Sequence, residues 1–302
     1  MTALQSLQTT NRDLLRSQQR ISTGFRISTA EENPAYWSIA TSMRTDNKSL
    51  STVRDALGLG MATVDVAYTA MDSSIDVATE IKVKLVAARE TGVDRAVVNR
   101  EIAELQNQLR SIASSATFSG QNWLSVNSSE TNHNAQRSVV ASLGRASDGS
   151  VTFNTITVDT SGTKLFDASA SAVGILDGLR DANGDLAASG FSVVDLSIAT
   201  LSESAADQAT LDSYIAGVDK AITAMTNAAT SLGTMKQRIT LQTNIVSSLI
   251  DVIERGISTL VDSDMNEEST KLQAYQVQQQ LGTQALNAAN GSSQSILSLF
   301  RN

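Results

Sequence analysis

Few side chains in this sequence could carry out chemistry, and the clearest candidate is an oxygen-rich turn. Asp181, Asn183 and Asp185 stand at alternate positions, which is the spacing of the oxygen ligands that open many calcium-binding loops. Such loops continue with glycine at the sixth position and glutamate at the twelfth, where this sequence has Leu186 and Ser192. The segment is therefore interpreted as a polar turn, and no metal or cofactor site is predicted.

Catalytic side chains are scarce in the rest of the sequence. The 302 residues include no cysteine and one histidine, and 4% of them are aromatic. Without cysteine, the chain has no disulfides, thiol nucleophiles or thiolate metal ligands. His133 lies in a polar stretch that offers no partner for a catalytic triad or a metal site. We therefore predict that the protein is not an enzyme and assign no catalytic residue.

Charge and hydropathy exclude two further classes of partner. The net charge is −8 and the sequence pI is about 4.7, whereas a nucleic-acid-binding protein would show a basic face. No run approaches the roughly 18 apolar residues of a membrane span, and the N-terminus lacks the basic and apolar regions of a cleavable signal peptide. Neither nucleic acid nor membrane insertion is predicted.

Long helices are the elements that organise this chain. Pro34 is the single proline, and an interior proline costs a helix about 3 kcal/mol or more. Apolar residues also recur every seven positions in two long rows, which is the pattern of helices packed along a common seam. The predicted rod core consists of Leu50, Leu57, Val64, Met71 and Leu85 from one row, and Leu211, Val218, Met225, Leu232, Ile239, Val246, Ile253 and Leu260 from the other.

A third apolar stripe, between residues 98 and 112, follows the first long helix after a short loop at Gly92. The short loop predicts that these two helices lie antiparallel. The helix carrying the second row begins with a capping-box pattern, Ser204 followed by Asp207. The sequence therefore predicts a mainly α fold, in which the N- and C-terminal halves form a long antiparallel helical rod.

The two ends of the chain carry weaker apolar stripes, diluted by polar residues such as Asn11 and Gln279. Weak stripes do not secure a helix on their own, so we expect both ends to be disordered in the monomer and ordered when partner subunits cover them. A pair of surface helices docked on the rod is the alternative. The residues predicted to pack between subunits are Leu7, Leu14, Ile21, Phe25, Leu272, Leu286, Ile296 and Phe300.

Residues 125–204 differ in composition from the rest. Gly, Ser, Thr, Asn and Asp dominate there, and two runs, Val151–Val158 and Phe191–Ile198, have the composition of β-strands. This segment is predicted to be a small β-containing insert that interrupts the rod.

Several motifs, taken together, resemble the bacterial flagellins. They are residues 20–27 (RISTGFRI), 31–43 (EENPAYWSIATSM), 117–124 (TFSGQNWL), 281–290 (LGTQALNAAN) and 295–301 (SILSLFR). The match covers roughly residues 1–125 and 205–302, and it is most similar to flagellins of alphaproteobacteria. It begins at Met1-Thr-Ala-Leu4, a few residues inside the usual N-terminus of the family, which predicts a trimmed form.

The resemblance implies a subunit that polymerises through its terminal helices into the extracellular flagellar filament and is exported without a cleavable signal peptide. Residues 1–42 and 265–302 would form the inner layer of the filament, 43–124 and 205–264 the rod, and 125–204 the exposed insert. Partners implied by the family are further copies of the chain, the flagellar cap, junction proteins and an export chaperone. Flagellins sensed by the vertebrate innate receptor carry arginine where this chain has Glu80, so weak receptor recognition is expected.

Two alternatives remain open. A hook–filament junction protein resembles flagellin at both ends without forming a long homopolymer. A flagellin-like surface protein could instead bind a polysaccharide through its insert, but residues 125–204 contain no Trp or Tyr to stack on sugars. Trp123 lies just before the insert, at the turn of the rod, and is interpreted as a packing residue.

Overall fold

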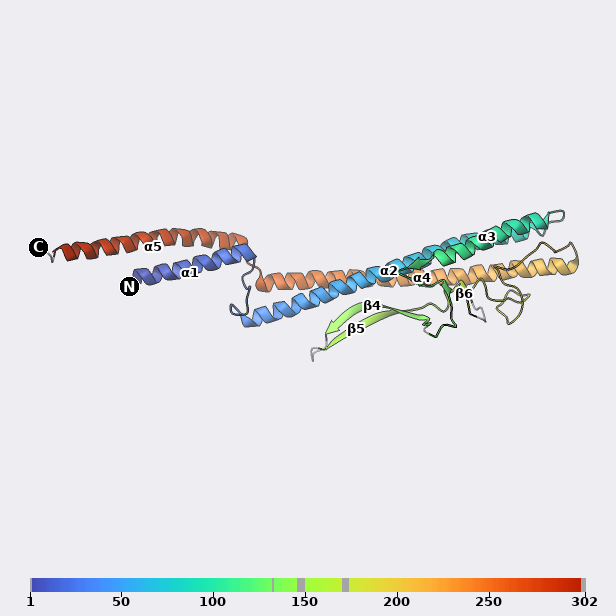
Figure 1. Ribbon diagram of the computed structural model, residues 1–302, viewed down its shortest axis with the longest axis horizontal. Coiled ribbons are helices and arrows are strands. Elements are labelled where there is room, and N and C mark those ends of the chain that lie inside the picture. The colour runs from blue at the N-terminus through green and yellow to red at the C-terminus, as the bar shows by residue number, and fades with distance from the viewer. Residues whose placement is uncertain (1, 132, 146–149, 170–173, 300–302) are drawn as a thin grey trace. The chain divides into compact units, whose positions relative to one another are not determined.

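The computed structural model describes residues 2–131, 133–145, 150–169 and 174–299 (Figure 1), with side chains given except at 2–3, 145, 151 and 289–299. The chain divides into two compact units: unit 1 comprises residues 1–49 and 248–302, and unit 2 comprises residues 50–247. The insert expected at 125–204 is thus part of unit 2. Unit 1 extends somewhat further along both long helices than the terminal segments expected from the sequence.

Five helices and six strands make up the described chain, so the predicted fold class, mainly α with a small strand-containing middle region, is confirmed. The helices are α1 (Thr2–Thr23), α2 (Pro34–Ala87), α3 (Arg95–Ser115), α4 (Ala205–Val261) and α5 (Met265–Leu299). The strands are β1 (Thr117–Phe118), β2 (Gln121–Asn122), β3 (Ser125–Val126), β4 (Gln136–Arg145), β5 (Val151–Asp159) and β6 (Phe166–Asp167).

In unit 2, α2 and α4 pack antiparallel in a constant register. Three ion pairs join α4 to α2 or to Arg89, which lies just beyond the end of α2. From each pair to the next the chain advances by the same number of residues on the two sides, in opposite directions. Such a register keeps the two apolar rows face to face along the contact. The pairs are Arg89–Asp212 at 3.2 Å, Lys82–Asp219, and Asp65–Lys236 at 2.7 Å.

Every residue of the predicted rod core that lies in unit 2 is buried. The last two members of the row, Ile253 and Leu260, belong to unit 1 and are half-buried. The buried set consists of Leu50, Leu57, Val64, Met71, Leu85, Leu211, Val218, Met225, Leu232, Ile239 and Val246.

The turn between α2 and α3 and the start of α4 follow the local signals of the sequence. Gly92 adopts a left-handed conformation with φ +86°, which glycine tolerates without strain. Asp94 then caps α3, because its Oδ1 accepts from the backbone amides of Ala96 and Val97. At α4, the backbone amide of Asp207 donates to Ser204 Oγ at 3.2 Å, as the capping-box pattern predicts.

The middle region is built on the antiparallel hairpin of β4 and β5, with an irregularity between Val140 and Ser142. The predicted strand at Val151–Val158 is confirmed as β5. Its partner β4 was not predicted from the sequence. The turn at Asp181 is also as interpreted, since Asp181 Oδ1 accepts from the backbone amides of Asn183 and Asp185.

The second predicted strand, Phe191–Ile198, was wrong. The backbone of this segment makes an isolated bridge to Arg180 and one bond to Leu176, and side chains of α3 bind several of its other polar groups, so no continuous strand partner is present. Gln106 Nε2 donates to the carbonyl oxygens of Val193 at 3.0 Å and Leu196 at 3.1 Å. Asn99 Oδ1 accepts from the backbone amide of Ile198 at 2.8 Å. The apolar residues Val193, Val194, Leu196 and Ile198 are buried without forming a ladder.

Candidate assembly surface

In unit 1, a turn after α1 brings the following segment against the end of α4. Gly24 has φ +75°, and beyond it the backbone amide of Arg26 donates to the carbonyl oxygen of Val261 at 2.7 Å. The amide of Ser263 returns a hydrogen bond to the carbonyl of Gly24 at 2.9 Å. A small core closes over this crossing, formed by buried Ile27, Ala40 and Val261 with half-buried Trp37, Ile257 and Leu260.

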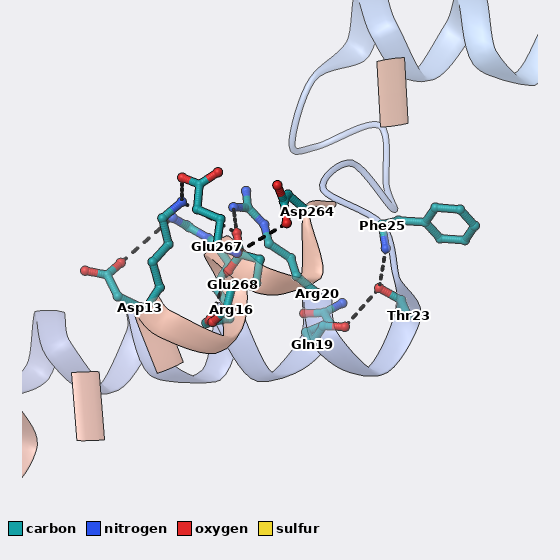
Figure 2. A network of polar contacts seen from close by, with 11 residues as sticks. Asp13, Arg16, Gln19, Arg20, Thr23, Phe25, Asp264, Glu267 and Glu268 are labelled. Carbon is teal, nitrogen blue, oxygen red and sulfur yellow. Dashed lines mark hydrogen bonds and ion pairs between the residues drawn. The ribbon is translucent and has the colours of Figure 1, made fainter. Parts of the chain in front are cut away.

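Helices α1 and α5 pack on each other through a buried polar network (Figure 2). Glu268 is 4% exposed, and its carboxylate accepts from the Ser17 hydroxyl at 2.9 Å and from Arg20 at 3.1 Å. Lys271 lies 3.7 Å from the same carboxylate and 2.7 Å from Glu267. A buried charge requires partners, and here both helices supply them.

This network also sets the charge state of Glu268. Burial alone would raise the pKa of its carboxyl, but the hydrogen bonds from Ser17 and Arg20, together with the charges of Lys271 and Arg20, lower it below the ordinary 4.5. The same neighbourhood acts on Lys271, because its hydrogen bond to Glu267 raises the pKa of the ammonium group. The pair of helices is therefore held by ionised groups at neutral pH.

Further along, the two helices remain close and antiparallel. Gln279 Nε2 donates to Asn11 Oδ1 at 2.6 Å. Gly282 then faces Leu7, where a Cβ atom in place of the glycine hydrogen would lie 3.0 Å from Leu7 Cδ1. The polar residues that weakened the apolar stripes in the sequence thus pair with each other across the helices.

The residues predicted to pack between subunits occupy different environments in unit 1. Leu14 is 8% exposed, so the chain itself covers it. Phe25 is 36% exposed and carries the Arg44 guanidinium 5.0 Å from its ring centre. The side chain of Ile296 and all of Phe300 lie outside the described residues. The half-buried members are Leu7, Ile21, Leu272 and Leu286. Contact of any of these residues with a neighbouring subunit stays a prediction.

A second set of apolar side chains in unit 1 is exposed, and the residues predicted from the sequence to pack between subunits do not include it. They recur at spacings of three, four or eleven residues, which places each pair on one face of its helix. Several exposed apolar pairs on one unit are typical of a surface that another protein covers. The pairs are Leu4 and Leu15 on α1, Tyr36 and Ile39 on α2, Leu249 and Val252 on α4, and Val277 and Leu281 on α5.

The described part of the chain shows neither a metal-binding cluster nor a membrane-spanning helix. Among these residues, no group of three or more His, Asp or Glu side chains is placed to hold a metal ion. None of the described helices combines the length and apolarity needed to cross a membrane. The exposed apolar pairs of unit 1 are therefore the strongest candidate for a functional surface.

Comparison with known proteins places similarity at both ends of the chain and over its full length. Residues 1–129 match the family profile described as bacterial flagellin N-terminal helical region, and residues 215–300 match the bacterial flagellin C-terminal helical region. Flagellin C of Rhizobium meliloti strain 1021 is 47% identical over 314 residues, covering 100% of this chain and 97% of that protein. Flagellin A of the same strain is 41% identical, covering 100% and 98%. A flagellin of Brucella melitensis is 40% identical, covering 100% and 96%.

Proposed function

Because the chain belongs to the bacterial flagellin family and is a structural subunit of the flagellar filament, we propose that it polymerises by packing α1 and α5 against neighbouring copies. The filament formed by its relatives is extracellular. The observation that carries the proposal is the set of exposed apolar pairs on unit 1, which includes Leu15 at 63% and Leu281 at 58% exposure. Covering these side chains supplies roughly 25 cal/mol per Å² of apolar surface.

We further propose the layer assignment expected from the sequence. Residues 1–42 and 265–302 form the inner layer, 43–124 and 205–264 the rod, and 125–204 the outer surface. Folding of the terminal helices is coupled to assembly, with the flagellar cap, junction proteins and an export chaperone as further partners. Export proceeds without a cleavable signal peptide, and the subunit has no enzymatic activity. The hook–filament junction alternative has no observation in its favour.

Seeded growth tests the proposed polymerisation. Purified chain is incubated with short filament seeds and imaged by negative-stain electron microscopy, while the free monomer is subjected to limited proteolysis. We expect long filaments, rapid cleavage of the monomer's terminal segments and a resistant core near residues 43–264. Absence of growth together with resistant termini would contradict the proposal and favour a docked monomer or a junction protein.

Matched serine substitutions locate the assembly surface. Leu15→Ser and Leu281→Ser should slow seeded growth severalfold, because each removes an apolar contact between subunits. Leu186→Ser is the control, since Leu186 is 61% exposed in the middle region and outside unit 1. Equal growth of all three variants would contradict packing through α1 and α5.

Weak recognition by the vertebrate innate receptor is proposed from Glu80. The side chain of Glu80 is exposed on α2. An acidic group there would repel a receptor group that pairs with arginine, or would leave that receptor group unpaired. Purified protein should therefore give a weak response in receptor-bearing cells, and Glu80→Arg should raise it. A strong response by the unsubstituted protein would overturn this proposal.

A further inference from the structure

Unit 2 contains a half-open cavity of about 440 Å³ between α2, the turn that follows α3, and strand β4. That volume lies within the range of small-molecule sites. Ala56 and Thr63 of α2 form one wall, and Phe118 and Trp123 come from the turn. The strand supplies residues 136–140 as the opposite wall. The assembly surface of unit 1 contributes none of these residues.

The position of Arg137 follows from the alternation of β4. Val139 touches α2, since a Cβ atom at Gly60 would lie 2.6 Å from Val139 Cγ1. Side chains two apart on a strand share a face, so Arg137 lies on the same side of β4 as Val139 and faces α2. Arg137 is also the single charged residue among those that line the cavity, in a chain with a net charge of −8.

Two polar atoms at this cavity are buried and lack a protein partner. Trp123 is 4% exposed, and its Nε1 has no hydrogen-bond acceptor among the described residues. Arg137 Nε is likewise buried without an acceptor in the described chain. Buried indole and guanidinium N–H groups ordinarily find acceptors, so two at one cavity indicate a ligand that supplies them.

The other residues that line the cavity indicate the chemical class of the ligand. Side-chain amides of Gln121 and Asn134 offer both donors and acceptors, which suits neighbouring hydroxyl groups. The ring of Phe118, which is half-buried at the cavity, suits the apolar face of a pyranose ring, while the buried Trp123 offers its N–H group. We propose that this cavity binds a pyranose that carries a carboxylate, with Arg137 pairing with the carboxylate and the Trp123 N–H donating to a ring substituent. The aromatic groups come from just before residues 125–204, which is why inspection of the insert alone did not reveal them.

Calorimetric titration of the full chain with glucuronate, glucose and acetate tests the proposal. Glucuronate should bind at least about tenfold more tightly than glucose, which lacks the carboxylate, and than acetate, which lacks the ring. An oligomer of glucuronic acid distinguishes the source: tighter binding than the monosaccharide supports a polysaccharide residue, and weaker binding supports a free sugar acid. Failure of glucuronate to bind, or equal affinity for acetate, would overturn the proposal.

Substitutions in both walls test whether glucuronate binds in this cavity. Arg137→Gln and Ala56→Leu should each lower the glucuronate affinity at least about tenfold, the first by removing the charge and the second by filling the space. Arg100→Gln makes the same charge change at an exposed position of α3 and should leave the affinity unchanged. In a Trp37→Phe background Trp123 is the one tryptophan, so its fluorescence should shift on titration. Unchanged affinity in both wall variants would overturn the assignment of binding to this cavity. None of these measurements involves polymerisation, so that result is distinct from failure of filament growth.

Discussion

The hydroxyl of Ser17 lies 2.9 Å from Oε2 of Glu268, a contact between two buried side chains that are 251 positions apart in the sequence. It joins α1 to α5, and Arg20 adds a second contact to the same carboxylate one turn further along α1. Apolar contacts alone tolerate sliding of one helix past another, whereas a buried carboxylate is stabilised only where its partners meet it. The pairing of the two ends of the chain is therefore specified by polar residues.

Glu268→Gln is expected to weaken this pairing. The substitution removes the charge that Arg20 and Lys271 face, so the α1–α5 contact should lose about 1–3 kcal/mol. Hydrogen exchange of the amides of α1 and α5, measured in assembled filaments, should show faster exchange in both helices. Glu267→Gln is the control, because the Glu267 side chain is 63% exposed and its ion pair with Lys271 contributes little. Equal effects of the two substitutions would contradict the role of the buried carboxylate.

Acid should weaken the same contact. The pKa of Glu268 is lowered in the folded chain, so its stabilising contribution is complete above the ordinary value of 4.5 and is lost as the pH falls through the lowered pKa. Exchange protection of α1 should therefore be constant from neutral pH to about 4.5 and decline below it. In Glu268→Gln filaments the part of the decline due to this group should be absent. A decline unaffected by the substitution would assign the acid sensitivity to other groups.

The helices could be predicted from the sequence because their signals are periodic and local. Leu57 and Leu232 belong to rows of apolar residues, and a row seven residues apart has few alternatives to a helix seam. The start of α4 also depends on neighbours three residues apart, Ser204 and Asp207. These predictions required no information about distant parts of the chain.

The middle region and the assembly surface could not be predicted in the same way. Phe191–Ile198 has the composition of a strand, but whether its backbone pairs with a strand or with side chains depends on Gln106, 87 and 90 positions away from its two carbonyl partners. Likewise, Leu14 and Leu15 are adjacent leucines, yet one is 8% and the other 63% exposed. The spacing of seven from Leu7 distinguishes Leu14 from Leu15, but no local pattern of α1 contains whether the chain itself or a neighbouring subunit covers Leu14.

Gln106→Ala should destabilise the segment around Val193. Its amide donates to two backbone carbonyls, and removing it leaves both without that donor in a buried region, at a cost of about 1–3 kcal/mol. Urea unfolding followed by circular dichroism measures the loss, and hydrogen exchange should locate it to residues 191–198. Gln108→Ala, at an exposed position of the same helix, should change stability by less than about 0.5 kcal/mol. A loss shared equally by the two variants would point to helix propensity instead.

Alanine substitutions at two glycines of α2 separate the effect of helix propensity on stability from the effect of packing between α2 and the β4–β5 hairpin. Gly58 faces open space, so Gly58→Ala should stabilise the chain by up to about 1 kcal/mol through the better helix propensity of alanine. Gly60→Ala makes the same change, but the new Cβ would lie 2.6 Å and 2.9 Å from the two methyl groups of Val139. Overpacking of this kind costs about 1–3 kcal/mol, so this variant should be less stable than Gly58→Ala by a similar amount.

The double variant Gly60→Ala/Val139→Ala identifies the cause of that difference. Removing the valine methyl groups relieves the contact, so part of the stability lost in Gly60→Ala should return, and a double-mutant cycle on urea unfolding gives the coupling between the two positions. Substitutions at Gly58 and Val139 should instead be additive, since nothing lies within 4 Å of a Cβ at Gly58. If Gly58→Ala and Gly60→Ala stabilise the chain equally, β4 does not pack on α2 at Gly60 in solution, and the wall that carries Arg137 would not face α2.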